Sequence, residues 1–123
     1  MYRLLIVDDE RRVREGLLSH IDWASLGIQP CGAADDGETA LPMLEQMRPD
    51  ILLTDVQMRR MSGLELSTKA REILPELEVV FISGYSDSEY IREALRLKAV
   101  DYVYKPIRLQ EVERVIRQVT AKL

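Results

Sequence analysis

Residues 4–10 have the sequence LLIVDDE, in which four apolar residues, Leu4–Val7, are followed at once by the acids Asp8, Asp9 and Glu10. A short, unbroken apolar run is typical of a strand that is buried on both faces, as in a parallel sheet. In open α/β sheets, ligands bind beyond the carboxyl ends of the strands. The stretch therefore predicts a first strand whose carboxyl end carries an acidic site.

Similar apolar runs recur along the chain, and patterns with helical spacing separate them. The predicted strands are Leu4–Val7, Ile28–Ala33, Ile51–Thr54, Val79–Ile82 and Tyr102–Tyr104. The helical patterns span Arg11–Ile21, Leu41–Met47, Leu64–Leu74, Ile91–Leu97 and Val112–Val119. Parallel strands need crossover connections, so this alternation predicts an α/β fold: one doubly wound, five-stranded parallel sheet with helices on both faces.

Several residues mark where these elements begin, bend or end. Ser62…Glu65 and Ser86…Glu89 are capping boxes that predict helix starts, and Pro75 is expected to end the third helix. Pro30 and Gly32 weaken the second strand signal. Pro42 lies inside the second helical pattern and is expected to kink or delay that helix.

The composition bounds the class of protein. The chain has 123 residues, of which 46% are hydrophobic and 31% charged, as in one globular domain. No apolar run approaches the ~18 residues of a membrane span, and the first one is too short for a signal-peptide core, so a soluble cytoplasmic protein is expected. One cysteine, Cys31, and one histidine, His20, exclude an internal disulfide and a zinc site of ordinary type. The net charge of −4 argues against nucleic-acid binding by this domain itself.

Polar residues follow four of the five predicted strands. Asp8-Asp9-Glu10 follows the first, Asp55 the third, Ser83-Gly84 the fourth and Lys105-Pro106 the fifth. Gathered at one edge, the carboxylates repel one another, and a single lysine cannot balance them. Mg²⁺ suits such a cluster, because it binds a few carboxylates and completes its shell with water and phosphate. These groups are also the parts that neutralise a transferring phosphoryl group.

These motifs together resemble the receiver domain of response regulators, the CheY-like fold of two-component signalling. The resemblance covers essentially residues 1–123 and implies the strand order 2-1-3-4-5. It is carried by the fragments Val7–Glu10, Asp50–Met58 with Met61 and Gly63, Phe81–Tyr85, Asp101-Tyr102 and Lys105-Pro106.

The resemblance implies a role for each residue at the strand ends. Asp55 is the expected phosphoacceptor, and Asp8, Asp9, Asp55 and the Gln57 backbone carbonyl are the expected Mg²⁺ ligands. Ser83 and Lys105 are expected to bind the phosphoryl oxygens, with the Lys105–Pro106 bond cis, while Tyr102 is the switch aromatic. Gln57 and Tyr85 are the positions expected to tune how fast the phosphoryl group is lost.

The resemblance also implies partners and an output surface. A sensor histidine kinase is the expected phosphodonor, and the domain catalyses only its own phosphorylation and dephosphorylation. The output surface is expected on helix Ser86–Lys98, the strand near Tyr102 and helix Leu109–Leu123. The segment Ile21–Ile28 resembles receivers coupled to AraC-type helix-turn-helix domains, so DNA binding is expected from a C-terminal domain outside this chain. Whether phosphorylation drives homodimer formation stays open.

Some residues depart from the family pattern without removing a chemical group from the site. Arg59 stands where proline is usual, Arg59 and Arg60 are expected to be solvated, and Lys98 stands where glycine usually ends the fourth helix. Trp23 is expected to anchor its loop, and Cys31 to fill the core or its edge.

Each site residue alone also fits a structural role. Asp8 and Asp9 could cap a helix, Lys105 could be a surface charge, Ser83 a turn residue and Tyr102 plain packing. The alternative function is a receiver-fold interaction module that works without phosphorylation. A cofactor carrier or enzyme on the same sheet is disfavoured, because no glycine-rich phosphate loop follows the first strand.

Overall fold

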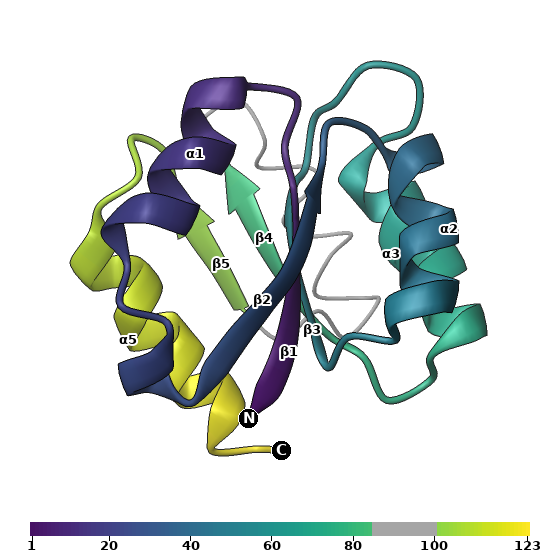
Figure 1. Ribbon diagram of the computed structural model, residues 1–123. Coiled ribbons are helices and arrows are strands. Elements are labelled where there is room, and N and C mark those ends of the chain that lie inside the picture. The colour runs from purple at the N-terminus through teal and green to yellow at the C-terminus, as the bar shows by residue number, and fades with distance from the viewer. Residues whose placement is uncertain (85–100) are drawn as a thin grey trace.

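The computed structural model describes residues 1–84 and 101–123, which form one parallel sheet with helices on both faces (Figure 1). The strands are β1 (Tyr2–Val7), β2 (Ile28–Ala34), β3 (Ile51–Asp55), β4 (Glu78–Ser83) and β5 (Asp101–Tyr104). The helices are α1 (Arg11–His20), α2 (Gly37–Met47), α3 (Gly63–Ile73) and α5 (Leu109–Thr120), with a short 3₁₀ turn at Ala24–Leu26. The strand order is β2-β1-β3-β4-β5 and every pair is parallel, so the predicted fold and order are confirmed.

The central strands supply two separate cores, because successive side chains of a strand point to opposite faces. Along β1, Leu4 and Ile6 face one core, whereas Leu5 and Val7 face the other. Helices α1 and α5 cover the first face, and α2 and α3 cover the second (Figure 1). Burial on both faces explains why these strands are unbroken apolar runs.

Helix α5 illustrates how spacing selects the buried stripe of a helix. Val112, Val115, Ile116 and Val119 are buried on the first core and recur at helical intervals. The helix ends at Thr120 rather than at the predicted Leu123, because the last residues form turns with bonds between residues three apart.

The second strand is longer than its sequence signal suggests. β2 runs to Ala34, and its register against β1 shifts between Leu4 and Leu5, which pair with Pro30 and Gly32. β2 is an edge strand with a neighbour on one side only, so a proline without an N–H is tolerated there. The register shift is a bulge that accommodates the extra residue.

Capping residues set the starts of α2 and α3. The Asp36 side chain accepts a hydrogen bond from the Thr39 N–H at 2.7 Å, so α2 begins at Gly37 and Pro42 does not delay its start. Ser62 accepts from the Glu65 N–H at 3.1 Å, as its capping box predicted. The box at Ser86…Glu89, the predicted helix Ser86–Lys98 and Tyr85 lie outside the described residues.

Trp23 anchors the long joint between α1 and β2. Its ring is buried in the first core, and its Nε1–H donates to the Leu17 carbonyl oxygen at 2.9 Å. Cys31 is half-buried against the second core. Both predictions are confirmed. Within residues 1–84 and 101–123, every helix is too short or too polar to cross a bilayer.

Candidate functional site

The register of the sheet brings the carboxyl ends of four strands to one edge. Val7 pairs with Thr54, Asp55 with Ile82, and Ser83 with Tyr104. Two main-chain bonds extend this ladder past the strands, from Val56 N to the Ile82 carbonyl at 3.0 Å and from Lys105 N to the Ser83 carbonyl at 2.7 Å. The strand-end residues predicted to converge therefore do so.

Three carboxylates form the centre of the site. Asp8 is 0% exposed and Asp55 3% exposed, while Asp9 is half-buried. One oxygen from each of the three lies within 4.8 Å of the others. Asp8 Oδ1 accepts from the Glu10 N–H at 2.8 Å, but Asp8 Oδ2 is buried without a hydrogen-bond partner among the described residues. A buried carboxylate oxygen with no donor is an incomplete arrangement that a cation or a water would complete.

Burial and mutual repulsion raise the pKa values of Asp8 and Asp55. Burial raises the pKa of Asp8 to about 6, against the opposing Glu10 N–H bond, and the negative charge of Asp55 adds to the increase. Burial also raises the pKa of Asp55, although the hydrogen bond and charge of Lys105 oppose that effect. Keeping these buried carboxylates ionised is therefore unfavourable in free energy, and a bound positive ion would reduce that penalty.

Lys105 and Ser83 lie next to this cluster. Lys105 Nζ donates to Asp55 Oδ2 at 3.1 Å and lies 3.5 Å from Glu10 Oε1. Burial acts to lower the pKa of Lys105, but the hydrogen bond to Asp55 and the negative charges of Asp55, Asp8 and Glu10 together outweigh it, so the pKa is raised. Ser83 is 0% exposed, and its Oγ has no hydrogen-bond partner in the described part of the chain. Lys105 is thus a fixed cation, and Ser83 offers a buried hydroxyl that is not bonded within the described residues.

Gln57, Tyr102 and the cis bond complete the predicted set. The Gln57 N–H donates to Asp55 Oδ1 at 3.3 Å, and the part of the Gln57 carbonyl as a metal ligand stays a prediction. Tyr102 is half-buried and stacks edge-to-face on Tyr104, with ring centroids 5.0 Å apart. The Lys105–Pro106 peptide bond is cis, as expected.

A close approach of two chain segments holds Asp55 in place. The Gly63 N–H donates to the Val56 carbonyl at 2.7 Å, at the start of α3. A Cβ on Gly63 would lie only 2.1 Å from the Asp55 carbonyl oxygen. The Thr54 hydroxyl donates to that same oxygen at 3.0 Å. Only glycine fits at position 63 while the phosphoacceptor candidate keeps this place.

Two charged residues near the site, Glu10 and Arg14, were given no role from the sequence. Glu10 and Asp55 both form ion pairs with Lys105. Arg14 Nη1 donates to the Asp8 carbonyl oxygen at 2.8 Å. The spacing could have indicated a contact for Arg14. It is four residues after Glu10, and residues four apart lie on the same side of a helix. Arg60 is exposed as expected, and it pairs with the α2 acids Asp36 at 3.6 Å and Glu38 at 3.4 Å.

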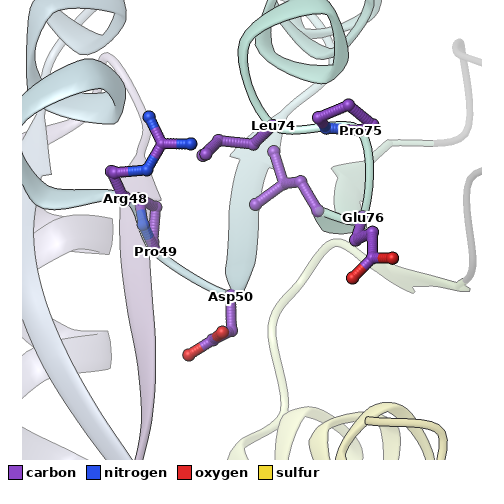
Figure 2. A pocket seen from close by; sticks show the side chains of 7 residues that line it. Arg48, Pro49, Asp50, Leu74, Pro75 and Glu76 are labelled. Atoms are coloured by element: carbon purple, nitrogen blue, oxygen red, sulfur yellow. The ribbon is translucent and has the colours of Figure 1, made fainter.

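A separate hollow lies at the opposite edge of the sheet, before β3 and β4. Its volume is about 470 Å³, and its lining is Arg48, Pro49, Asp50, Leu74, Pro75, Glu76 and Leu77. Figure 2 shows Arg48 extending toward Leu74, with the carboxylates of Asp50 and Glu76 pointing away from it. Its charged groups do not converge, and in parallel sheets the chemistry is placed at the other edge. The strand-end cluster is therefore the candidate site.

The comparisons with known proteins agree with this geometry. Residues 4–117 match the family model of the response regulator receiver domain. The REC domain of AraT, a response regulator from Geobacillus stearothermophilus, superimposes with a TM-score of 0.93 and 39% identity, over 98% of this chain and 94% of that one. The two-component transcriptional regulator AraC from Clostridium phytofermentans gives 0.92 and 40%, over the same shares. The predicted resemblance to receivers of AraC-type regulators is confirmed.

Curated relatives are longer than this chain. The uncharacterized transcriptional regulatory protein YesN of Bacillus subtilis is 34% identical over 100% of this chain and 33% of its own length. The transcriptional regulatory protein HptR of Staphylococcus aureus is 30% identical over 100% of this chain and 48% of its own length. The chain thus spans a third to a half of these relatives, whose names describe regulators rather than enzymes.

Proposed function

The chain belongs to the response regulator receiver domain family, and we propose that it is a phosphorylation-dependent switch whose phosphoacceptor is Asp55. The observation that carries this proposal is the convergence of three carboxylates, Lys105 and the buried Ser83 hydroxyl at one sheet edge. Among the described residues, that hydroxyl has no hydrogen-bond partner. A carboxylate, an ammonium group and a hydroxyl around a cation site are what phosphoryl transfer requires.

Mg²⁺ fits the acidic cluster. Hard oxygen ligands and a small number of carboxylates match its preference. Asp8 Oδ2, which no described residue contacts by a hydrogen bond, is a ligand atom inside the cluster. Asp8, Asp9 and Asp55 would hold the ion, with the Gln57 carbonyl as a further ligand. Its contribution is positive charge, which offsets the repulsion among the carboxylates and with phosphoryl oxygens.

Asp55 acts as the nucleophile in this proposal. One of its oxygens forms a new bond to phosphorus while the bond between phosphorus and the donor breaks, and the donor leaves with that electron pair. The donor is a phosphohistidine of a sensor kinase or a small acyl phosphate. No general base is needed, because an ionised carboxylate is already a nucleophile and Lys105 stabilises that form of Asp55.

Ser83 and Lys105 convert the new charge into a change of surface. Phosphorylation adds ~1.5–2 negative charges and three acceptor oxygens. The Ser83 hydroxyl donates to one oxygen and Lys105 pairs with another, which moves the segments after β4 and β5. Tyr102, half-buried beside this edge, turns inward, and the output surface includes β5 and α5. Gln57 and Tyr85 tune the lifetime of the phosphorylated state.

The longer relatives support an output through transcription. Because they are transcriptional regulators in name and exceed this chain in length, we infer that residues 1–123 are the N-terminal receiver of a cytoplasmic regulator. A C-terminal domain outside this chain would bind DNA. The receiver itself would catalyse only its own phosphorylation and dephosphorylation.

Incubation with acetyl phosphate and Mg²⁺, followed by intact mass measurement, tests the proposal. The parent protein should gain one phosphoryl group, and Asp55→Asn should gain none. Asp35→Asn is the matched control, since Asp35 follows β2 at the same sheet edge but is exposed and outside the carboxylate cluster. A parent protein that stays unmodified with excess donor and metal would favour the alternative, an interaction module that works without phosphorylation.

Ser83→Ala separates acceptance from switching. Because Ser83 is not the nucleophile, the variant should still be phosphorylated on Asp55. It should lose the change that phosphorylation causes in the parent, measured as NMR shifts of the β5 and α5 amides. Equal shifts in variant and parent would refute the role given to Ser83.

A further inference from the structure

Arg14 is bound by two hydrogen bonds to the acidic turn, residues Asp8–Glu10, which follows β1. Its Nη1 donates to the Asp8 carbonyl at 2.8 Å, and its main-chain N–H donates to the Glu10 carbonyl at 3.2 Å. Its side chain is half-buried, whereas those of Arg11 and Arg12 on the same helix are exposed. Arg11 pairs instead with Glu15 at 2.7 Å. Of these three arginines, Arg14 is the one whose side chain donates a hydrogen bond to the turn.

The turn needs such an anchor because it carries three consecutive acids. Asp8 is held at its N–H by the Ala34 carbonyl at 3.1 Å and at Oδ1 by the Glu10 N–H. The bond from Arg14 fixes the remaining main-chain group of Asp8. A hydrogen bond from a guanidinium is roughly twice as strong as a neutral one, so it resists rotation of this peptide group. Without it, repulsion among the acids favours opening of the turn.

The contacts of Arg14 indicate a geometric role rather than charge neutralisation. In the described part of the chain, Lys105 forms ion pairs with Asp55 and Glu10, whereas Arg14 forms none with a carboxylate. The two roles predict opposite effects. Loss of a nearby positive charge strengthens cation binding, but loss of a group that orients metal ligands weakens it.

We propose that Arg14 is a positioning residue that fixes the Asp8–Glu10 turn and thereby increases the affinity of the carboxylate cluster for Mg²⁺. The part that concerns Mg²⁺ rests on the proposed function, whereas the anchoring of the turn does not. Arg14 touches neither the ion nor the phosphoryl group in this proposal. It acts through the main chain of Asp8.

Calorimetric titration with Mg²⁺ measures the first consequence. Arg14→Gln should raise the dissociation constant about tenfold, the lower end of the effect of groups that orient metal ligands. Arg14→Lys keeps the charge and one donor, so it should restore part of the affinity. Arg12→Gln removes the same charge from an exposed position on α1, and it should leave the affinity within about twofold of the parent.

Amide hydrogen exchange in EDTA measures the second consequence without metal. Exchange of the Glu10 N–H, which donates to Asp8 Oδ1, should be about tenfold faster in Arg14→Gln and unchanged in Arg12→Gln. Unchanged exchange at Glu10, or equal or tighter Mg²⁺ binding by Arg14→Gln, overturns the assignment. A parent protein that binds no Mg²⁺ would refute the proposed metal site, and exchange at Glu10 would then decide the role of Arg14 alone.

Discussion

Replacing Gly63 with alanine should both destabilise the domain and displace Asp55. The new Cβ would lie 2.1 Å from the Asp55 carbonyl oxygen, about 0.9 Å inside the 3.0 Å that real Cβ contacts keep. The position of the Cβ is set by the main chain of residue 63, and the Asp55 oxygen is itself a main-chain atom, so no side-chain rotation can relieve the contact. The start of α3 or the end of β3 must therefore move, and the 2.7 Å bond from Gly63 N to Val56 is strained or lost.

The magnitude follows from two opposing effects. Overpacking of this kind costs about 1–3 kcal/mol, and loss of a backbone hydrogen bond adds about 1 kcal/mol. The better helix propensity of alanine returns less than about 1 kcal/mol. We expect Gly63→Ala to lower the free energy of unfolding by about 2 kcal/mol, which corresponds to a fall in Tm on the order of 8 °C.

Gly16→Ala is the matched control. Gly16 lies inside α1, and a Cβ there would have His20 Nδ1 as its nearest atom at 3.9 Å, an ordinary contact. This variant should gain about 0.5–1 kcal/mol from helix propensity. Urea unfolding followed by circular dichroism measures both variants. Phosphorylation by acetyl phosphate should slow on the order of 10-fold or more in Gly63→Ala, because Asp55 is misplaced. If Gly63→Ala matches the parent protein in stability and rate, the close approach does not hold Asp55.

Three further variants test the acidic cluster, the buried core and the hydrogen bond that secures the α1–β2 joint. Asp8→Asn should stabilise the metal-free protein at pH 7 by about 3 kcal/mol, because burial raises the pKa of Asp8 to about 6 from 3.8 and the folded parent loses stability as pH rises through that interval. In urea titrations with EDTA this advantage should disappear by about pH 4, and a gap that stays constant with pH would contradict the cause given. Leu44→Ala, at a fully buried position, should cost about 2–5 kcal/mol in the same assay, whereas Leu18→Ala at an exposed position of α1 should stay within about 0.5 kcal/mol. Trp23→Phe removes the bond to the Leu17 carbonyl and should cost about 1–2 kcal/mol, and an unchanged unfolding midpoint would show that the indole N–H does not secure the joint.

Local patterns predicted most of the fold. The apolar runs at Leu4–Val7 and Ile51–Thr54 became central strands buried on both faces, because only a covered parallel sheet satisfies such runs. The second strand was predicted weakly and is longer than expected. Its register shift opposite Pro30 and Gly32 depends on the neighbouring β1, which local propensity does not contain.

The candidate site was predicted in part. Asp8, Asp9, Asp55, Ser83 and Lys105 were identified because each lies just after the end of a predicted strand, and parallel strands end at a common edge. The contacts of Arg14 and Glu10 were not predicted, since a surface arginine and an acid at a helix start are common without any role. Their partners are set by the rotation of α1 relative to the turn.

The sequence by itself determined the order of strands and helices, the two apolar faces of the sheet and the identity of the acids at the strand ends. These follow from periodicity and from the residue that comes next, which are local properties of the chain. Only the tertiary structure decided that Asp8 Oδ2 and the Ser83 hydroxyl are buried without hydrogen-bond partners among residues 1–84 and 101–123, and that Gly63 must lack a side chain. Burial, unmet hydrogen bonds and close approach are relations between segments far apart in sequence, so they exist only once the sheet and helices have packed.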